Sequence, residues 1–403
     1  MKEEEKRTLF HYQSIEGIGY KTIMKLLKHI GVKNDVGCVP GLEEWEDIGK
    51  IGEDELTMLV GKSKALKLIV GNREKSASQK AYDNMIKAKI AYVTCFESVF
   101  PDKLRNIYDP PVGLFYYGKM PSDNSMNVAV IGARLCSEYG KYVADGYARI
   151  LGGNGCGVIS GMALGIDAVG QKGALDAGGY SMGVLGNGVD ICYPAENKVL
   201  YERLKEEGGV MSEYPPGTMP KKTYFPMRNR LISGLSDVLL VVEARKKSGT
   251  LITADRALEQ GKDVYAVPGR VTDALSYGCN RLISEGAGVA VSPQEFLDEI
   301  MKDRVTIKTE LCKQNKGLME LKRNGCLMDV ALEQSLECPI LRAIGITPVS
   351  LQEWYEKYLI ISGEKMEIAV FSAEVFKLLL RKKVKKIDGS GYYCRQDAVL
   401  NEW

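Results

Sequence analysis

The sequence predicts an α/β protein, an extended Rossmann-like, doubly wound and mostly parallel sheet with a small helical N-terminal domain and a C-terminal winged-helix-like domain. From residue 127 to about 301, short β-branched runs alternate with amphipathic stretches, which is typical of a parallel sheet covered on both faces. Glycine-rich turns follow nearly every run at its carboxyl end, where open α/β sheets bind ligands. The predicted strands are Val128–Ile131, Val158–Ser160, Ser181–Leu185, Val210–Ser212, Val238–Val242, Val264–Val267 and Val289–Val291.

Residues 1–75 are expected to form a separate helical domain ahead of a sheet domain that spans residues 76–302. A Gly-Ile-Gly turn within Ile15–Thr22 opens an amphipathic run, and a weaker copy occurs at Ile48–Gly52. Such turns resemble helix-hairpin-helix units, whose backbone N–H groups can meet phosphates. A small packing domain with tight interhelical turns remains the alternative.

A polar linker is predicted over residues 303–335, followed by a diverged winged-helix-like domain over residues 336–403. Helical patterns cover Leu351–Tyr358 and Ser372–Leu380, and a basic strand, a glycine turn and a second strand follow from Arg381. The charge run either contacts DNA or forms a solvated face.

Bulk composition restricts the possible functions. The chain has 403 residues with 54 basic and 52 acidic side chains, a net charge of +2, so a polyanion partner requires local clustering of cations. The N-terminus is charged and no apolar run approaches the roughly 20 residues of a membrane span, so we expect a cytoplasmic protein without a membrane contact. With only two histidines, both near the N-terminus, no metal and no cofactor are expected in the sheet domain.

The segment between Tyr214 and Ser236 contains four cations, grouped around Phe225, but no acidic residue. Its functional side chains are Lys221, Lys222, Phe225, Arg228, Asn229 and Arg230. Because Pro220 and Pro226 interrupt it, the segment is expected to be an exposed loop that leads into a helix. The cations would contact the phosphates of a nucleic-acid backbone, and a base would stack on Phe225. This combination favours single-stranded nucleic acid. One of the two arginines is expected to face phosphate while the other forms a salt bridge.

Three turns after predicted strands add to this edge. Gly132-Ala133-Arg134 brings an arginine to a helix start that Ser137 caps, an expected anion site that lacks the dinucleotide-binding glycine pattern. Ser160 and Gly161 allow close backbone approach after the second strand. Ser248-Gly249-Thr250 starts another helix, which is either phosphate-competent or simply well capped.

Three carboxylates also follow strands, namely Asp167, Asp190 and Glu213. Paired carboxylates can support metal or acid-base chemistry, but each of these adjoins a glycine or proline turn. Structural roles in capping and loop hydrogen bonding are therefore expected, and no catalytic residue is assigned.

Several ordered motifs resemble the DNA-processing protein A (DprA, or Smf) family. They include Ser160-Gly161 with Gly165-Ile166-Asp167, Gly186 to Asp190, Ser212 to Thr218, Phe225-Pro226 with Arg228-Asn229-Arg230, and Val267-Pro268-Gly269. The resemblance covers about residues 90–295 and includes Phe100-Pro101 and Asp109-Pro110-Pro111.

The resemblance implies a non-enzymatic homodimer that binds single-stranded DNA, protects it, and hands it to a RecA-type recombinase during natural transformation of competent cells. It places the DNA pocket at Arg134, Lys222, Phe225, Arg228 and Arg230. The chain departs from the family pattern at Ala133, Leu164, Gln171 and Asp255.

Two alternatives stay open from the sequence. The sheet also resembles that of phosphoribohydrolases, which act on nucleotides, but Thr253 stands where those enzymes carry a carboxylate. The second alternative is a sensor that binds a nucleotide without turning it over.

Overall fold

The computed structural model describes residues 1–30, 48, 50–73, 75–302, 349–362, 368, 370–372, 375, 378, 384–386 and 392–395. The chain divides into two compact units, Met1–Thr309 and Glu310–Trp403. The predicted linker over residues 303–335 lies outside the described residues.

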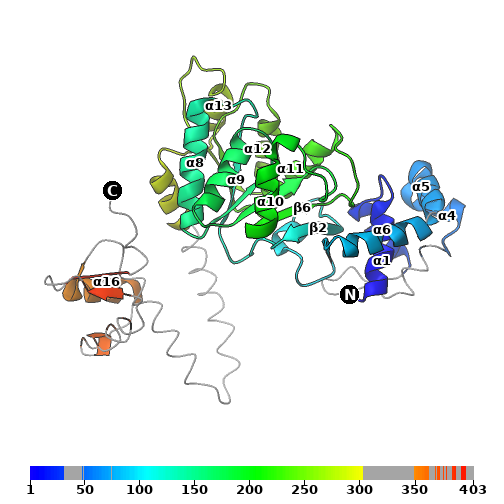
Figure 1. Cartoon of the computed structure of the whole chain (residues 1–403), viewed down its shortest axis with the longest axis horizontal. Helices are drawn as coiled ribbons and strands as arrows, with labels where there is room; N and C mark the ends of the chain where they lie inside the picture. The colour runs from blue at the N-terminus through cyan, green and yellow to red at the C-terminus, as the bar shows by residue number, and fades with distance from the viewer. Residues whose placement is uncertain are drawn as a thin grey trace. The chain divides into compact units, whose positions relative to one another are not determined.

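The first unit begins with helices that surround an apolar core of their own. They are α1 (Glu3–Ser14), α2 (Tyr20–His29), α4 (Glu53–Val60), α5 (Lys62–Arg73) and α6 (Lys75–Lys87). As predicted, α2 and α4 each start directly after a glycine turn, at Gly19 and Gly52. Phe10 of α1 packs edge-on against Tyr92 and Phe115, which lie on the first two strands. The helices therefore dock on that edge of the sheet, and Figure 1 shows them in blue beside β2 and β6.

A nine-stranded sheet forms the centre of this unit, in the order β1-β2-β6-β5-β4-β3-β7-β8-β9. Seven strands match the seven predicted runs: β3 (Asn127–Ile131), β4 (Gly157–Ser160), β5 (Ser181–Leu185), β6 (Gly209–Ser212), β7 (Val238–Val241), β8 (Asp263–Ala266) and β9 (Gly288–Val289). All neighbouring pairs among these seven are parallel. The sequence did not reveal the two antiparallel strands β1 (Ala91–Thr94) and β2 (Gly113–Gly118), which extend the sheet beyond β6.

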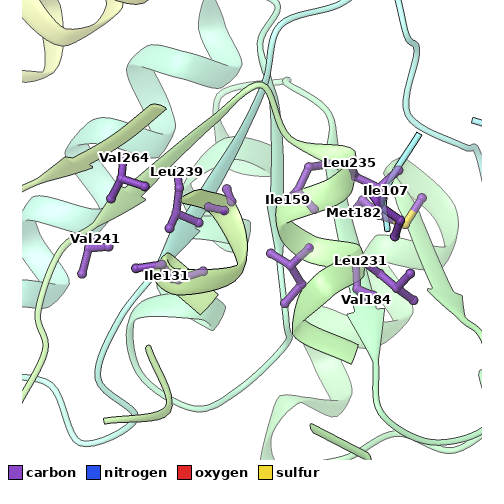
Figure 2. Close-up of a cluster of buried hydrophobic side chains, with 14 of the residues drawn as sticks. Ile107, Ile131, Ile159, Met182, Val184, Leu231, Leu235, Leu239, Val241 and Val264 are labelled. Atoms are coloured by element: carbon purple, nitrogen blue, oxygen red, sulfur yellow. The ribbon is translucent and has the colours of Figure 1, made fainter. Parts of the chain in front are cut away.

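Helices cover both faces of the sheet, as the continuous apolar strands require. On one face lie α7 (Asp102–Arg105), α11 (Tyr224–Leu235), α12 (Gly249–Glu259) and α13 (Tyr277–Ser284). Figure 2 shows Leu231 and Leu235 of α11 among side chains of β4 and β5, such as Ile159 and Val184. The other face carries α8 (Glu138–Gly153) and α9 (Ile166–Asp176), and α10 (Lys198–Glu207) packs near β2 and β6.

The order of the strands creates a crevice beside β3. The chain proceeds from β3 through β4 and β5 to β6 on one side, then returns to place β7 on the other side of β3. The loops that leave the carboxyl ends of β3 and β7 therefore run to helices on opposite faces and separate. Open α/β sheets bind ligands at such a switch point.

The second unit contains β10 (Val349–Ser350), α16 (Leu351–Ser362), β11 (Val384–Lys386) and β12 (Tyr392–Arg395). The three strands form an antiparallel sheet in the order β10-β12-β11. Trp354 and Tyr358 of α16 are buried together with Phe371. The described residues of this unit thus hold helix α16 and three short antiparallel strands, and the winged-helix-like domain over residues 336–403 stays a prediction.

Candidate nucleic-acid interface

A groove of about 610 Å³ lies at the switch point between β3 and β7. The β3–α8 loop, the β7–α12 loop and the first turns of α11 and α12 line it. Four exposed cations line the groove, namely Arg134, Lys222, Arg245 and Lys247, of which Lys222 directly precedes α11. Among the described lining residues the single carboxylate is Asp167, which is buried. The groove is therefore strongly cationic although the chain as a whole is nearly neutral.

Phe225 lies half-buried in this groove between an aromatic ring and a guanidinium. Tyr193 stacks on it with ring centroids 5.6 Å apart and an angle of 29° between the planes. The guanidinium carbon of Arg134 lies 5.6 Å from the centroid of the Phe225 ring, within the range of a cation–π contact. The structure thus brings together the predicted residues Arg134, Lys222 and Phe225.

The prediction that Phe225 and Pro226 lie in an exposed loop is wrong. They belong to the first turn of α11, which begins at Tyr224. Proline is compatible with this position because the first four N–H groups of a helix have no partner within it. Because Phe225 belongs to the first turn of α11, its backbone is held by the helix. A loop would not fix the position of the ring in this way.

Arg228 is buried beneath Phe225, with 5% of its surface exposed. Its Nη1 donates to the carbonyl oxygen of Gly161 at 2.7 Å and also to that of Val184. Burial lowers the pKa of Arg228 to about 10, which leaves the guanidinium charged at neutral pH. Arg228 therefore ties α11 to the carboxyl ends of β4 and β5 below the groove.

Asp167 accounts for the second buried charge under the groove. Its Oδ2 accepts from the N–H of Gly161 at 3.1 Å. Burial raises the pKa of Asp167 above its usual value, and the nearby charge of Arg228 partly opposes this shift. A side chain at position 161 would collide with the Arg228 guanidinium, so this exchange of hydrogen bonds requires glycine there.

Arg230 lies outside the groove, on another side of α11. Its Nη2 donates to Glu213 at 2.8 Å, and its Nε lies 3.5 Å from Asp109. With 8% of its surface exposed, it joins α11 to the loop after β6 and to the segment before β2. The expected salt bridge of one arginine is confirmed for Arg230. The expectation that the other arginine faces phosphate is wrong, because Arg228 is buried and donates to backbone carbonyl groups.

The remaining predicted residues support the groove or lie at its margin. Ser160 is buried and donates to Val130, while Asn229 accepts from Nε of Arg228 at 3.2 Å. Gly132 accepts from the hydroxyl of Thr250 at 3.1 Å, which joins the β3 loop to α12. Lys221 points away from the groove and forms an ion pair with Glu16 at 2.9 Å.

The expected anion site at the start of α8 is already filled from within the protein. Ser137 caps the helix as predicted by accepting from the N–H of Gly140 at 2.9 Å. The buried carboxylate of Glu243 accepts from both the N–H and the hydroxyl of Ser137. Glu243 thus takes the place that a phosphate would occupy, and it holds the loop that presents Arg134.

Arg245 and Lys247 are functional candidates that the sequence analysis did not single out. Both follow β7 and lead to Ser248, whose hydroxyl accepts from the N–H of Thr250 and caps α12 at 3.1 Å. The signal was present as three consecutive cations directly before a capped helix. These cations could be assigned to the groove only once β7 was known to lie beside β3, and the sequence alone does not determine that strand order.

The other two carboxylates also have structural partners. Asp190 accepts from the N–H of Gly217 at 2.9 Å, and Glu213 holds Arg230. Thr253 is buried and donates to the carbonyl oxygen of Gly249. In the parts of the chain that the structure describes, no cluster of three or more His, Cys, Asp or Glu side chains could hold a metal ion, and no helix is long and apolar enough to cross a membrane.

Comparisons with known proteins identify the family. The family described as DNA recombination-mediator protein A matches residues 91–301, a range that holds all nine strands of the sheet. DNA processing protein DprA of Streptococcus pneumoniae is 42% identical over 213 residues, which cover 52% of this chain and 74% of that protein. This chain belongs to the DNA recombination-mediator protein A family. The resemblance to DprA is therefore confirmed.

Two further matches extend the family assignment. DNA processing protein DprA of Bacillus subtilis is 39% identical over 207 residues, covering 51% of this chain and 70% of that protein. The X-ray structure of DNA processing protein A from Streptococcus pneumoniae is 35% identical, with a TM-score of 0.57 over 69% of this chain and 96% of that one. The groove residues from Ile131 to Thr253 all lie within the range that matches the family.

Proposed function

We propose that this member of the DNA recombination-mediator protein A family binds single-stranded DNA in the groove between β3 and β7. The observation that carries the proposal is the Phe225 ring, held between Tyr193 and Arg134 among four exposed cations. An aromatic face can stack on an unpaired base, whereas the bases of a duplex already stack on one another. The cations would contact phosphates without regard to sequence.

The proposal assigns different roles to the predicted residues. Arg134 and Lys222, together with Arg245 and Lys247, contact the DNA backbone, and Phe225 contacts a base. Arg228, Arg230, Ser160, Gly161 and Asn229 are buried or engaged within the protein, and they position the helix that carries Phe225. Gly132 and Thr250 hold the two loops of the groove together. No step of this function requires catalysis.

We also propose the larger role that the family resemblance implies. The protein would protect an incoming single strand in the cytoplasm and hand it to a RecA-type recombinase during natural transformation. It would act as a homodimer. The outer edge of the sheet supports this last point, because Val289 of the edge strand β9 is 41% exposed and Val291, two residues after that strand, is 67% exposed.

The salt dependence of DNA binding tests the proposed function. Four phosphate contacts on a single strand predict a slope of about −3 for log affinity against log salt, roughly a 50-fold loss between about 50 and about 200 mM salt. Fluorescence anisotropy with a labelled oligothymidylate measures this slope. An unlabelled duplex is expected to compete poorly with this probe, and an unlabelled single strand of mixed sequence is expected to compete well.

Two results would oppose the proposal. Affinity that does not change with salt would show that the cations do not contact phosphate. Equal competition by single-stranded and duplex DNA would show that the aromatic ring does not read unpaired bases.

A further inference from the structure

The first turn of α11 separates the groove from a second cavity of about 710 Å³. Lys222 and Phe225 face the groove, while Lys221 and Tyr224, each one residue earlier, line the second cavity. Each cavity is thus lined by one lysine and one aromatic residue of this segment. Tyr224 and Phe225 are adjacent in the first turn of α11 and therefore point in different directions, and Lys221 and Lys222 precede the helix. One short segment, residues 221–225, thus lines both cavities.

The second cavity repeats the chemistry of the groove. Tyr214 stacks on Tyr224 with ring centroids 4.2 Å apart and an angle of 20° between the planes, as Tyr193 stacks on Phe225. Nζ of Lys221 lies 5.2 Å from the centroid of the Tyr224 ring. A cation beside a stacked aromatic pair is suited to a nucleotide, with the base on the ring and the phosphate near the ammonium.

The N-terminal helices supply the opposite wall of this cavity. The turn before α2 contains Gly17, whose φ of +87° favours glycine, and buried Ile18 anchors the turn in the helical core. No side chain in the described part of the chain caps α2 at Gly19, and its first turn contains no acid. Lys21, exposed in that first turn, also lines the cavity.

The carboxylates that line the cavity do not exclude a phosphate. Asp109 and Glu213 already pair with Arg230. Glu16 pairs with Lys221, but 70% of its side chain and 52% of that of Lys221 are exposed, so solvent screens the pair. A phosphate could therefore replace Glu16 as the partner of Lys221.

We infer that the second cavity binds further nucleotides of the same single strand, so that the N-terminal helical unit is part of the DNA interface. This inference rests on the proposed function of the groove. The strand crosses the first turn of α11 from Phe225 to Tyr224, and it then passes between Tyr224 and the amino end of α2. A strand long enough to reach the second cavity gains contacts that a short strand lacks.

Oligonucleotides of two lengths test this inference with the full chain. Oligothymidylates of about 6 and about 16 nucleotides lie in the lower part and at the upper end of the range of about 4–16 nucleotides that OB-fold single-strand binders occupy. Lys21→Ala is expected to weaken binding of the long oligonucleotide about fivefold and to reduce the magnitude of its salt slope by about 0.7, with less than about a twofold change for the short one. Tyr224→Leu is expected to have a similar or larger effect on the long oligonucleotide.

Lys28→Ala is the matched control, since Lys28 is an exposed lysine of α2 outside the cavity. Thermal unfolding of each variant shows whether it folds. If Tyr224→Leu does not fold, Lys21→Ala alone decides the test. The inference is overturned if Lys21→Ala behaves like Lys28→Ala with the long oligonucleotide, or if it weakens both lengths equally. If the unaltered protein binds neither length, the proposed function itself fails.

Discussion

Replacing Phe225 with alanine is expected to weaken the binding of an oligothymidylate by about 5- to 150-fold, because stacking contributes about 1–3 kcal/mol per base. The ring is held by Tyr193 on one side and approached by Arg134, so it is oriented before DNA arrives. Little conformational entropy of this side chain is therefore lost on binding. Anisotropy titration at constant salt measures the loss of affinity.

Phe225→Tyr is the matched control, since it keeps the aromatic face and is expected to bind within about threefold of the unaltered protein. Arg134→Ala should weaken binding too, and it should also lower the magnitude of the salt slope by about 0.7 because one phosphate contact is lost. Equal affinities for Phe225→Ala and Phe225→Tyr would show that no base stacks at this position.

Replacing Arg228 with alanine is expected to destabilise the first unit by about 3–5 kcal/mol, the usual effect of leaving a buried charge without compensation. The change removes two hydrogen bonds to the carbonyl oxygens of Gly161 and Val184. It also leaves Asp167 buried without the opposing charge of Arg228. Denaturant unfolding followed by circular dichroism measures the change.

A second substitution separates the charge effect from the loss of hydrogen bonds. Arg228→Met combined with Asp167→Asn is expected to recover part of the stability lost by Arg228→Met alone, because the introduced amide would carry no charge and its oxygen could still accept from the N–H of Gly161. Arg245→Ala, at an exposed position, is expected to change stability by less than about 0.5 kcal/mol. If Arg228→Ala unfolded at the same denaturant concentration as the unaltered protein, Arg228 would not have the structural role described above.

The central sheet could be predicted from the sequence because its buried strands are continuous apolar runs. The runs at Val128, Ser181 and Val238 correspond to strands that are buried along their full length. The strands β1 and β2 lack this signal, since Tyr116 and Tyr117 at the end of β2 are only partly covered. Tyr92 of β1 and Phe115 of β2 pack against Phe10, which lies more than 80 residues away in the sequence.

The site could be predicted in part. Arg134, Lys222 and Phe225 meet in the groove because the carboxyl ends of parallel strands share one edge of the sheet. The burial of Arg228 could not be foreseen, since it depends on carbonyl groups of β4 and β5 that the sequence does not place beside α11. Arg245 and Lys247 join the groove only because the strand order places β7 next to β3.

Photo-cross-linking tests the central claim most directly, since it locates the bound strand on the protein without any substitution. The full chain is irradiated with an oligothymidylate, digested, and examined by mass spectrometry for peptides that carry a nucleotide. The groove predicts adducts on the peptides that contain Phe225 and Tyr193. Adducts confined to residues 310–403, with none on those two peptides, would contradict the account.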